Sequence, residues 1–404
     1  MTEEQIKFVQ KIRPRMLQHL EEDILPYWLL PPMLGDPVGN FPTYANQYGF
    51  PDNAKSRYAR MHGRQTYAYL AAYHLLHREG LLDYGLAGLK KLKGYENEKG
   101  GYFAKFAADG HAFQDPVTIQ DQCYSFFPHI MAYRVTRERE YLEKIWAFVS
   151  FIDKGPYLRS DGSYCDSLMP DLMTVCDFET PTLNIVSVID FVNLILLPAL
   201  YVTPEDEITV ERKELLVKWV DLLVADYWAN GIFWNDKVNR SDCHAKHVDL
   251  GHTSKSYGIL LKANELFAKW GLPSRHSGII QWYPEIVCAA SDDKVGWKTD
   301  FDVSATTFQD SGLQWWRHIL IDQTVFHYAS KFPHLISLLE KGVRAWFDCN
   351  YVDKVRMCRG IREGLRSDGS LYSDADEISC KANCWKNAYH EVEHVLTLCG
   401  EECQ

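Results

Sequence analysis

The sequence predicts an all-α protein of the (α/α)6-barrel class, with short β-hairpins or turns in the loops that connect the helices. Two observations support this fold class. Apolar residues recur at helical spacing over long segments, and strand-like alternation is confined to short pieces around turns. A turn motif also recurs between the helices at roughly equal spacing, which favours helical hairpins arranged in a ring. An open helical solenoid is the alternative architecture.

The helical segments have a clear period and well-marked ends. Gln65–Gly80 is apolar at helical spacing and stops at a glycine, a common helix terminator. The same pattern predicts helices over residues 137–155, 211–228, 256–271 and 332–347. The longest apolar run, Ile185–Val202, contains Asp190, Asn193 and Pro198. It is therefore predicted to be a buried helix that ends near the proline, and not a membrane span.

The segments between the helices repeat a second signal. "LRSDGSYCD" (Leu158–Asp166) returns as "LRSDGSLYSD" (Leu365–Asp374). Looser versions occur at Glu96–Gly110, Trp228–Asp236 and Ser291–Asp302. Each combines Asp, Asn or Gly with flanking aromatic residues, which predicts a tight turn or a short hairpin. No Pro/Ser/Gly-rich linker divides the chain, so residues 1–404 are predicted to form a single domain.

Composition narrows the class of function. The chain is 46% hydrophobic and 24% charged, as in soluble globular proteins with a large core. Its net charge of −11 is spread along the sequence, which argues against nucleic acid or an anionic membrane as a partner. The N-terminal residues 1–16 lack an apolar core, so we expect no signal peptide and a cytoplasmic location. Aromatic residues make up 13% of the chain, and such side chains both fill cores and stack on sugar rings.

One stretch concentrates histidines, "CHAKHVDLGHTSKSYGILL" (Cys243–Leu261). Its segment from His252 onward runs into an apolar helical pattern, with Thr253 and Ser254 as candidate N-cap residues. His252 would then lie at the start of a helix, either as an acid/base group or as an ordinary structural histidine. Cys243, His244 and His247 could instead bind zinc, but the residues around Asp249 look like a loop and no distant ligand set completes such a site. We expect no metal.

Three further groups of residues could carry chemistry. Near the C-terminus, Trp385 and Lys386 are followed by Tyr389 and His390 at the start of a predicted helix. Trp315 and Trp316 are adjacent, so in a helix one can pack in the core while the other faces a pocket. The segment before and within the first long helix holds Arg57, Arg60, His62 and Arg64, of which at least two arginines could simply be a charged helix face.

Taken in order along the chain, these pieces resemble the N-acylglucosamine 2-epimerase family, which includes cellobiose 2-epimerases and aldose–ketose isomerases acting on mannose. The resemblance rests on Arg64, Gly251-His252, Trp315-Trp316 and Trp385-Lys386 leading to Tyr389-His390. It spans almost the whole chain. It implies an (α/α)6 barrel, a sugar-like substrate, no cofactor and, as occurs in the family, a homodimer.

The resemblance also implies a mechanism and a set of site residues. One histidine of the pair His252 and His390 removes the C2 proton of an open-chain sugar, and Arg64 holds the oxygen of the resulting enediolate. Histidine titrates near neutrality, as this proton transfer requires. The implied substrate-binding residues are Tyr124, Asn184, Lys255, Trp315, Trp316, Trp385, Lys386 and His62.

The sequence departs from the family pattern at four positions. Lys255 stands where a glutamate is expected three residues after the Gly-His histidine, and "TPTLN" (Thr180–Asn184) stands for an Asn-Pro-His-Met-His segment. Leu320, with Asp322 nearby, replaces a glutamate, and His62 replaces a glutamine. A lysine near His252 would disfavour the imidazolium form and could attract an anionic sugar.

Three other functions stay open from the sequence alone. The first is an isomerase or cyclase that acts on a non-sugar metabolite on the same scaffold. The second is a glycoside hydrolase or lyase, which would need a carboxylate pair drawn from residues such as Asp121, Asp177, Asp249 and Asp310. The third is a non-catalytic binding protein.

Overall fold

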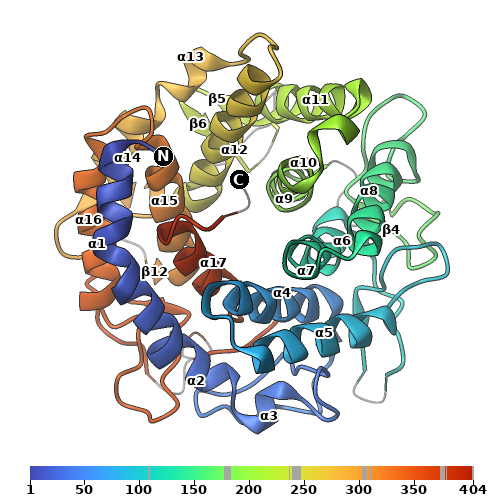
Figure 1. The fold of residues 1–404 in the computed structure, drawn as a ribbon, viewed down its shortest axis with the longest axis horizontal. Coiled ribbons are helices and arrows are strands. Elements are labelled where there is room, and N and C mark those ends of the chain that lie inside the picture. Colours follow the sequence, from blue (N-terminus) through green and yellow to red (C-terminus); the bar gives the residue numbers. More distant parts are fainter. Residues whose placement is uncertain are drawn as a thin grey trace. The chain divides into compact units, whose positions relative to one another are not determined.

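Helices make up most of the computed structural model, and its strands are two or three residues long (Figure 1). The structure describes residues 1–107, 110–176, 183–235, 237–238, 247–302, 307–309, 312–373, 378 and 380–402. These residues fall into two compact units, which we describe separately. The first unit holds Met1–Ile24, Lys213–Cys380 and His394–Glu402, and the second unit holds Leu25–Arg212 and Lys381–Glu393.

The second unit is built from helices that pack in consecutive pairs. Its helices are α2 (Leu25–Trp28), α3 (Pro31–Leu34), α4 (Ala59–Leu76), α5 (Glu79–Lys93), α6 (Ile119–Phe126), α7 (Pro128–Thr136), α8 (Arg139–Lys154), α9 (Ile185–Asp190), η2 (Phe191–Leu196), α10 (Leu197–Val202) and the short η3 (Glu205–Glu207). The helix α4 packs on α5, α6 and α7, and α7 packs on α8. Figure 1 shows α4 and α5 running side by side.

The first unit repeats this arrangement. Its helices are α1 (Glu3–His19), η1 (Leu20–Ile24), most of α11 (Val210–Tyr227), α12 (Leu250–Lys269), α13 (Ser277–Ile280), α14 (Tyr283–Ala290), α15 (Trp315–Tyr328) and α16 (Leu335–Asp348). The helix α12 packs on α15, and α15 packs on α16. The last helix, α17 (Tyr389–Leu398), begins in the second unit and ends in the first.

The helices α4, α6, α12 and α15 each begin directly after a short strand. The strands are β1 (Arg57–Tyr58) before α4, β3 (Val117–Thr118) before α6, β7 (His247–Asp249) before α12 and β12 (Leu313–Gln314) before α15. Their partners are β2 (Lys105–Phe106), β4 (Ser167–Leu168), β10 (Asp300–Asp302), which also pairs with β11 (Thr307–Gln309), and β13 (Gly364–Leu365). The described residues also hold the hairpins of β5 (Trp228–Ala229) with β6 (Ile232–Phe233) and of β8 (Ser291–Asp292) with β9 (Gly296–Trp297). All these pairs are antiparallel, and the pairs that contain β1, β3, β7 and β12 fix where the helices after them start.

The predicted turns are confirmed. In the two "RSDGS" motifs, the glycines Gly162 and Gly369 have φ of 85° and 82°, a left-handed conformation that suits glycine. In both, the amide of the glycine donates to the arginine carbonyl three residues earlier, at 3.0 Å from Gly162 and 2.8 Å from Gly369. The repeated sequence therefore encodes a repeated turn.

The first long helix ends earlier than its sequence predicts. The helix α4 stops at Leu76, because His77 takes up a left-handed conformation with φ of 51° and its amide donates to the carbonyl of Tyr73. Gly80, the predicted terminator, already lies inside α5. Glycines in α5 serve packing instead, since a Cβ at Gly88 would lie 2.4 Å from the hydroxyl oxygen of Thr66.

The apolar segment 185–202 is helical throughout, and it does not end at Pro198. Before the proline the chain widens into the π-helix η2, in which the amide of Leu197 donates to the carbonyl of Val192, five residues back. A wider turn gives the proline ring room that a regular α-helix lacks. The segment is long and apolar enough to cross a membrane, but 72% of it is buried inside the protein, as in a core helix.

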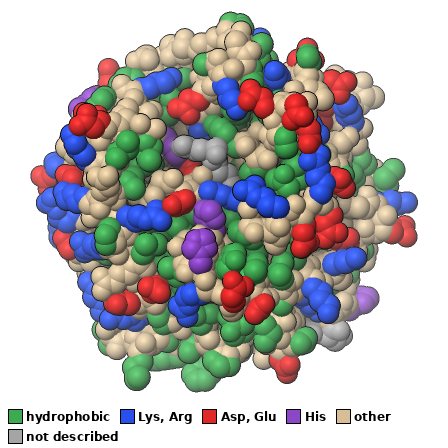
Figure 2. Space-filling view, in the orientation of Figure 1, with side chains coloured by type: hydrophobic (Ala, Val, Ile, Leu, Met, Phe, Trp, Pro, Cys, Tyr) green, Lys and Arg blue, Asp and Glu red, His purple; other side chains and the backbone are tan. Residues whose placement is uncertain are grey.

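Charge on the face of the molecule in Figure 2 is mixed, with acidic and basic side chains interspersed among hydrophobic ones. This agrees with the dispersed charge of the sequence, which sums to −11. A steering field for a polyanion would need basic residues gathered on one surface.

Candidate active site

Arg64, in the second turn of α4, carries a buried positive charge. Its guanidinium carbon lies 3.6 Å from the centroid of the Tyr124 ring and 5.7 Å from that of Tyr389. Its Nη1 donates to the carbonyl of Trp385 at 2.8 Å, and its Nε has no hydrogen-bond partner among the residues that the structure describes. Within the described part of the chain no carboxylate pairs with Arg64. A buried guanidinium without a counter-ion is costly, so this arrangement is typical of a group that meets an anion in the bound state.

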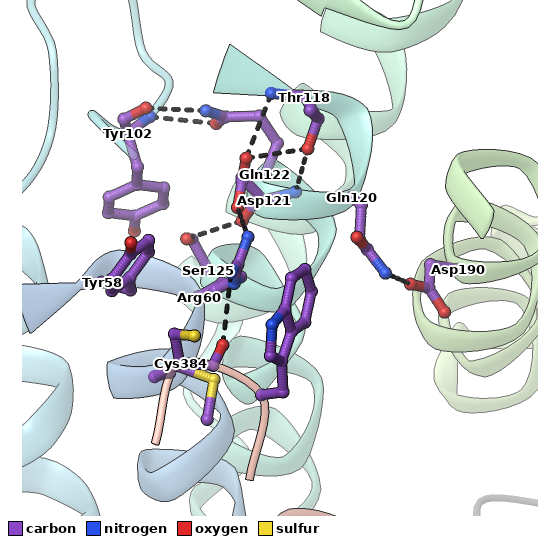
Figure 3. Close-up of polar contacts among 12 residues, drawn as sticks. Tyr58, Arg60, Tyr102, Thr118, Gln120, Asp121, Gln122, Ser125, Asp190 and Cys384 are labelled. Atoms are coloured by element: carbon purple, nitrogen blue, oxygen red, sulfur yellow. Dashed lines mark hydrogen bonds and ion pairs between the residues drawn. The ribbon is translucent and has the colours of Figure 1, made fainter. Parts of the chain in front are cut away.

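Arg60, one turn before Arg64, has an acidic partner and also binds the loop that contains Cys384 (Figure 3). Its Nη1 forms an ion pair with Asp121 at 2.9 Å, and its Nη2 donates to the carbonyl of Cys384 at 3.2 Å. Asp121 in turn closes a capping box with Thr118 at the start of α6. The carbonyls of Cys384 and Trp385 are thus both held by arginines of α4, which fixes the loop that precedes α17.

His390 is the second residue of α17, and it is 7% exposed. The centroid of its imidazole lies 4.5 Å from the centroid of the Tyr389 ring. The hydroxyl of Tyr389 donates to Glu393 at 3.1 Å, and the hydroxyl of Tyr67 donates to the other oxygen of that carboxylate at 2.7 Å. Burial raises the pKa of Tyr389 well above its usual range, so the tyrosine stays neutral. His390 therefore lies between two residues of α17, Tyr389 and Glu393, that hydrogen bonds hold in place.

Tyr124 joins a polar group that the sequence did not reveal. Its hydroxyl donates to Oδ1 of Asp190 at 3.4 Å. The side-chain amide of Gln120 donates to Oδ2 of Asp190 at 2.9 Å (Figure 3). Asp190 is buried at the junction between α9 and the π-helix η2. Its only sequence signal is an acidic residue inside the most apolar run of the chain.

His252 is the third residue of α12 in the first unit, and its imidazole is paired with a carboxylate. Nδ1 of His252 lies 2.7 Å from Oδ2 of Asp249, and the ring centroid lies 4.8 Å from that of Trp316. Burial alone would raise the pKa of Asp249, but the imidazole of His252 and the guanidinium of Arg317 together lower it below its ordinary value. Asp249 is therefore ionised near neutral pH.

The start of α12 corrects two sequence-based predictions. Asp249 is the N-cap, accepting a hydrogen bond from the amide of Gly251 at 2.7 Å, whereas Thr253 and Ser254 lie inside the helix. The hydroxyl of Thr253 instead donates to the carbonyl of Phe233 at 3.1 Å. Asp249, expected in a loop, ends a strand that pairs with β10. An aspartate two residues before Gly251 was a readable capping signal.

The adjacent residues Trp315 and Trp316 differ in burial, as their spacing in a helix predicts. Trp315 is 2% exposed and packs in the core. Trp316 is half-buried, and its indole donates to the side-chain oxygen of Gln314 at 2.7 Å. Because Trp316 is the one that contacts His252, it remains the better candidate for a surface on which a sugar ring stacks.

Lys255 follows His252 by three residues and is buried, at 5% exposure.

Two predicted substrate-binding residues, and also Asp322, have structural contacts. Asn184 is exposed and caps α9 by accepting a hydrogen bond from the amide of Val186 at 2.9 Å. Lys386 is fully buried and paired with Glu391. Asp322, near the missing glutamate position, is buried beside Trp297 and His394. These contacts favour roles in stability. Trp385 differs, because it is 51% exposed and covers the guanidinium of Arg60 at 4.1 Å.

His62 lies in the packing between α4 and α5. Its Nε2 donates to the carbonyl of Gly88 at 2.9 Å, and its ring stacks on Phe41 at 5.1 Å. Burial lowers the pKa of His62 to about 4, against the opposing effect of the Gly88 hydrogen bond. The placement indicates a core residue, and we leave His62 out of the proposed site.

The buried neutral state of His62 predicts a pH-dependent loss of stability. Its folded pKa is lower than its unfolded pKa of about 6.5, so the unfolded chain binds the proton first. The contribution is complete above pH 6.5 and is lost as pH falls toward 4, by about 3 kcal/mol. His62→Gln keeps a donor for Gly88 and should remove this part of the acid loss in urea unfolding measured across that range. The surface variant His334→Gln is the control. Equal pH dependence of wild type and His62→Gln would contradict the prediction.

Several residues considered from the sequence cannot be placed. Cys243 and His244 of the zinc alternative, and the hydrolase candidates Asp177 and Asp310, lie outside the described residues. So does Thr180 of the "TPTLN" segment.

Comparison with solved structures shows the fold. No family model and no curated protein matches the sequence. The structure matches the cellobiose 2-epimerase of Spirochaeta thermophila with a TM-score of 0.82 and 16% identity, over 97% of each chain. It matches the cellobiose 2-epimerase of Bacillus thermoamylovorans with a TM-score of 0.82 and 14% identity, over 97% of this chain and 99% of that one. A D-mannose isomerase matches with a TM-score of 0.77 and 16% identity, over 96% and 97%.

The chain has the fold of the sugar 2-epimerases.

This result confirms the (α/α)6-barrel fold class, and the low identity agrees with a divergent sequence. The sugar-epimerase fold is shared more distantly with hydrolases. The α-1,6-mannanase GH76A of a Salegentibacter species matches with a TM-score of 0.59 and 11% identity, over 96% of this chain and 99% of that one. Fold alone therefore does not separate an isomerase from a hydrolase, and the side chains have to.

Proposed function

We propose that the protein is a carbohydrate 2-epimerase or an aldose–ketose isomerase. The proposal is supported by the likeness to cellobiose 2-epimerases and to a mannose isomerase over almost the whole chain. It is also supported by the chemistry of three residues, the histidines His252 and His390 and the arginine Arg64. The cytoplasmic location and the homodimer remain predictions.

The reaction we propose is a proton transfer at carbon. The sugar opens to its aldehyde, and one imidazole takes the proton from C2. The electron pair of that C–H bond forms the C1–C2 double bond, and the former carbonyl pair moves to O1, giving an enediolate. For epimerisation the proton returns to the other face of C2, and the O1 pair restores the aldehyde. For isomerisation the proton goes to C1 while the O2 hydroxyl passes its proton to O1, which leaves the carbonyl at C2. His252 and His390 serve as the acid/base pair, and each transfer contributes roughly 10²–10⁴-fold.

The observation that carries the proposal is the uncompensated charge of Arg64. An enediolate oxygen is an anion that exists only during the reaction, and a pre-placed cation stabilises it with little reorganisation. Arg64 is buried, lacks an acidic partner among the described residues and lies beside Tyr389, the neighbour of His390. Tyr124, which stacks on this guanidinium, would contact the substrate with it.

The remaining contacts would bind the sugar rings. Trp316 and the half-exposed Trp385 offer flat apolar faces of the kind that stack on sugars. Lys255 would favour a sugar with a negative charge, such as a uronate or a phosphorylated or sulfated sugar.

A glycoside hydrolase is the competing function, because the mannanase shares the fold. It would need a carboxylic acid that stays protonated near neutral pH. Of the described candidates, Asp249 has a lowered pKa, which is the wrong direction, and Asp121 is committed to Arg60 and Thr118. An isomerase acting on a non-sugar metabolite would keep the same histidines and arginine.

Product analysis tests the proposal. The purified protein is incubated with neutral, N-acetylated and acidic aldoses, singly and as disaccharides, and products are separated by chromatography. We expect a C2 epimer or the matching ketose from at least one sugar, and no cleavage of glycosidic bonds. Release of monosaccharides from a disaccharide, with no epimer or ketose, would overturn the proposal in favour of a hydrolase.

A further inference from the structure

The carboxylate of Asp249 makes two separate contacts at the start of α12. Its Oδ1 accepts the hydrogen bond from the amide of Gly251 at 2.7 Å, which caps the helix. Its Oδ2 lies 2.7 Å from Nδ1 of His252. A carboxylate only accepts hydrogen bonds, so it selects the imidazole tautomer that carries its proton on Nδ1. The lone pair of His252 is then on Nε2.

We propose that Asp249 is a positioning residue for the acid/base chemistry of His252. It holds the imidazole in the Nδ1–H tautomer and in one orientation, so that Nε2 is the atom that exchanges a proton with the substrate. The inference rests on the proposed function of His252. The exposed fractions of the two side chains fit these roles. Asp249, which positions the ring, is 8% exposed, and His252, which exchanges the proton with the substrate, is 23% exposed.

Arg317 and Asp300 hold the side chain and the backbone of Asp249 in place. Nε of Arg317, on α15, lies 3.4 Å from Oδ1 of Asp249, and Nη1 of Arg317 lies 2.7 Å from both oxygens of Asp300. Asp300 is also the residue paired with Asp249 in the β7–β10 ladder. The same strand pair thus anchors the backbone of Asp249 and, through Arg317, its side chain.

The imidazole ring of His252 also packs against Trp316. Its ring centroid lies 4.8 Å from that of His252, at an interplanar angle of 40°. The approach depends on Gly251, because a Cβ there would lie 2.8 Å from the Trp316 ring and 3.1 Å from Cα of Arg317. With Asp249 at Nδ1 and Trp316 against the ring, His252 has little freedom to rotate.

This arrangement accounts for the most unusual departure from the resembled family. The glutamate expected three residues after His252 is Lys255, so the carboxylate beside the imidazole is missing on that side. Asp249 supplies a carboxylate three residues before His252. Residues three apart on a helix start lie on one face, so either position can reach the ring.

The variant Asp249→Asn tests the inference, because asparagine caps a helix about as well as aspartate. Its amide can donate to Nδ1 and so favour the opposite tautomer. We expect kcat to fall on the order of 10²–10⁴-fold with KM changed less than about threefold. We also expect ¹⁵N-NMR of histidine-labelled protein to show the His252 proton moving from Nδ1 to Nε2. Assignment uses His252→Gln.

The matched control is Asp292→Asn, which removes the same charge from another aspartate of the first unit whose carboxylate accepts backbone amides, those of Lys294 and Val295. It should leave the His252 signals and kcat unchanged. An Nδ1 proton that persists in Asp249→Asn, or a kcat loss with no change of tautomer, would overturn the inference. If wild type turns over no sugar, the proposed function fails, and the tautomer measurement still decides the role of Asp249.

Discussion

Replacing Arg64 by methionine is expected to lower kcat/KM by roughly 10²–10³-fold while leaving the protein as stable as wild type, within about 1 kcal/mol. The guanidinium is buried and no carboxylate of the described residues neutralises it, so its removal leaves no unpaired charge behind. Methionine fills a similar volume beside Tyr124 and is a good helix former. Steady-state kinetics and thermal unfolding of the same preparation check both parts.

Arg60→Met is the matched control, because Arg60 lies one turn away on the same helix and has an acidic partner. Its loss leaves Asp121 buried without its cation, which should cost about 3 kcal/mol of unfolding free energy. The account therefore predicts opposite profiles, with activity lost mainly in Arg64→Met and stability lost mainly in Arg60→Met. A large loss of stability in Arg64→Met with kcat/KM intact would contradict the role we give it.

Asp322→Ala is expected to be the most destabilising of the substitutions considered, by about 3–5 kcal/mol. Oδ1 of Asp322 accepts the indole hydrogen bond of Trp297 at 2.8 Å, and Oδ2 lies 2.9 Å from Nε2 of His394 and 3.4 Å from that of His318. Alanine would leave the buried indole of Trp297 and Nε2 of His394 without these hydrogen bonds and open a cavity. Urea unfolding checks the prediction, with the exposed Asp368→Ala as control.

The same carboxylate should make stability fall in acid. Burial alone would raise the pKa of Asp322, but His318 and His394 lower it to about 2, below the ordinary value of 3.8. The stabilisation is complete above about pH 4 and is lost as pH falls toward 2, by about 2 kcal/mol. Asp322→Ala should lack this part of the acid loss. A variant with the stability and acid response of wild type would show that the buried network contributes little.

Much of the fold could be predicted from local sequence. Helical periodicity located α4, α8, α11, α12 and α16, and the two "RSDGS" motifs gave turns with left-handed glycines. Helix ends were harder, because they depend on single residues. His77 ends α4 before the expected Gly80, and a π-helix carries the chain past Pro198. The left-handed conformation of His77 and the π-helix before Pro198 could not be predicted from the sequence, because the backbone conformation at both places depends on packing.

The candidate site was predictable only in part. The positions of Arg64, His252 and His390 near the starts of their helices agree with the sequence-based predictions, and Trp316 lies in a helix. The partners of these residues come from other segments of the chain, and spacing alone cannot supply them. The contact of Tyr124 with Asp190 joins positions 66 residues apart. Asp249 was close enough to His252 to be recognised, but it was assigned to a loop.

The most direct test of the account is proton NMR in D₂O, which follows the C2 proton of neutral, N-acetylated and acidic aldoses in the presence of the protein. The account predicts that deuterium enters C2 of at least one sugar. It also predicts that His390→Ala and His252→Ala each abolish the exchange while circular dichroism shows the fold retained. Exchange that survives in both variants, or no exchange with any sugar, would contradict proton transfer by these two histidines.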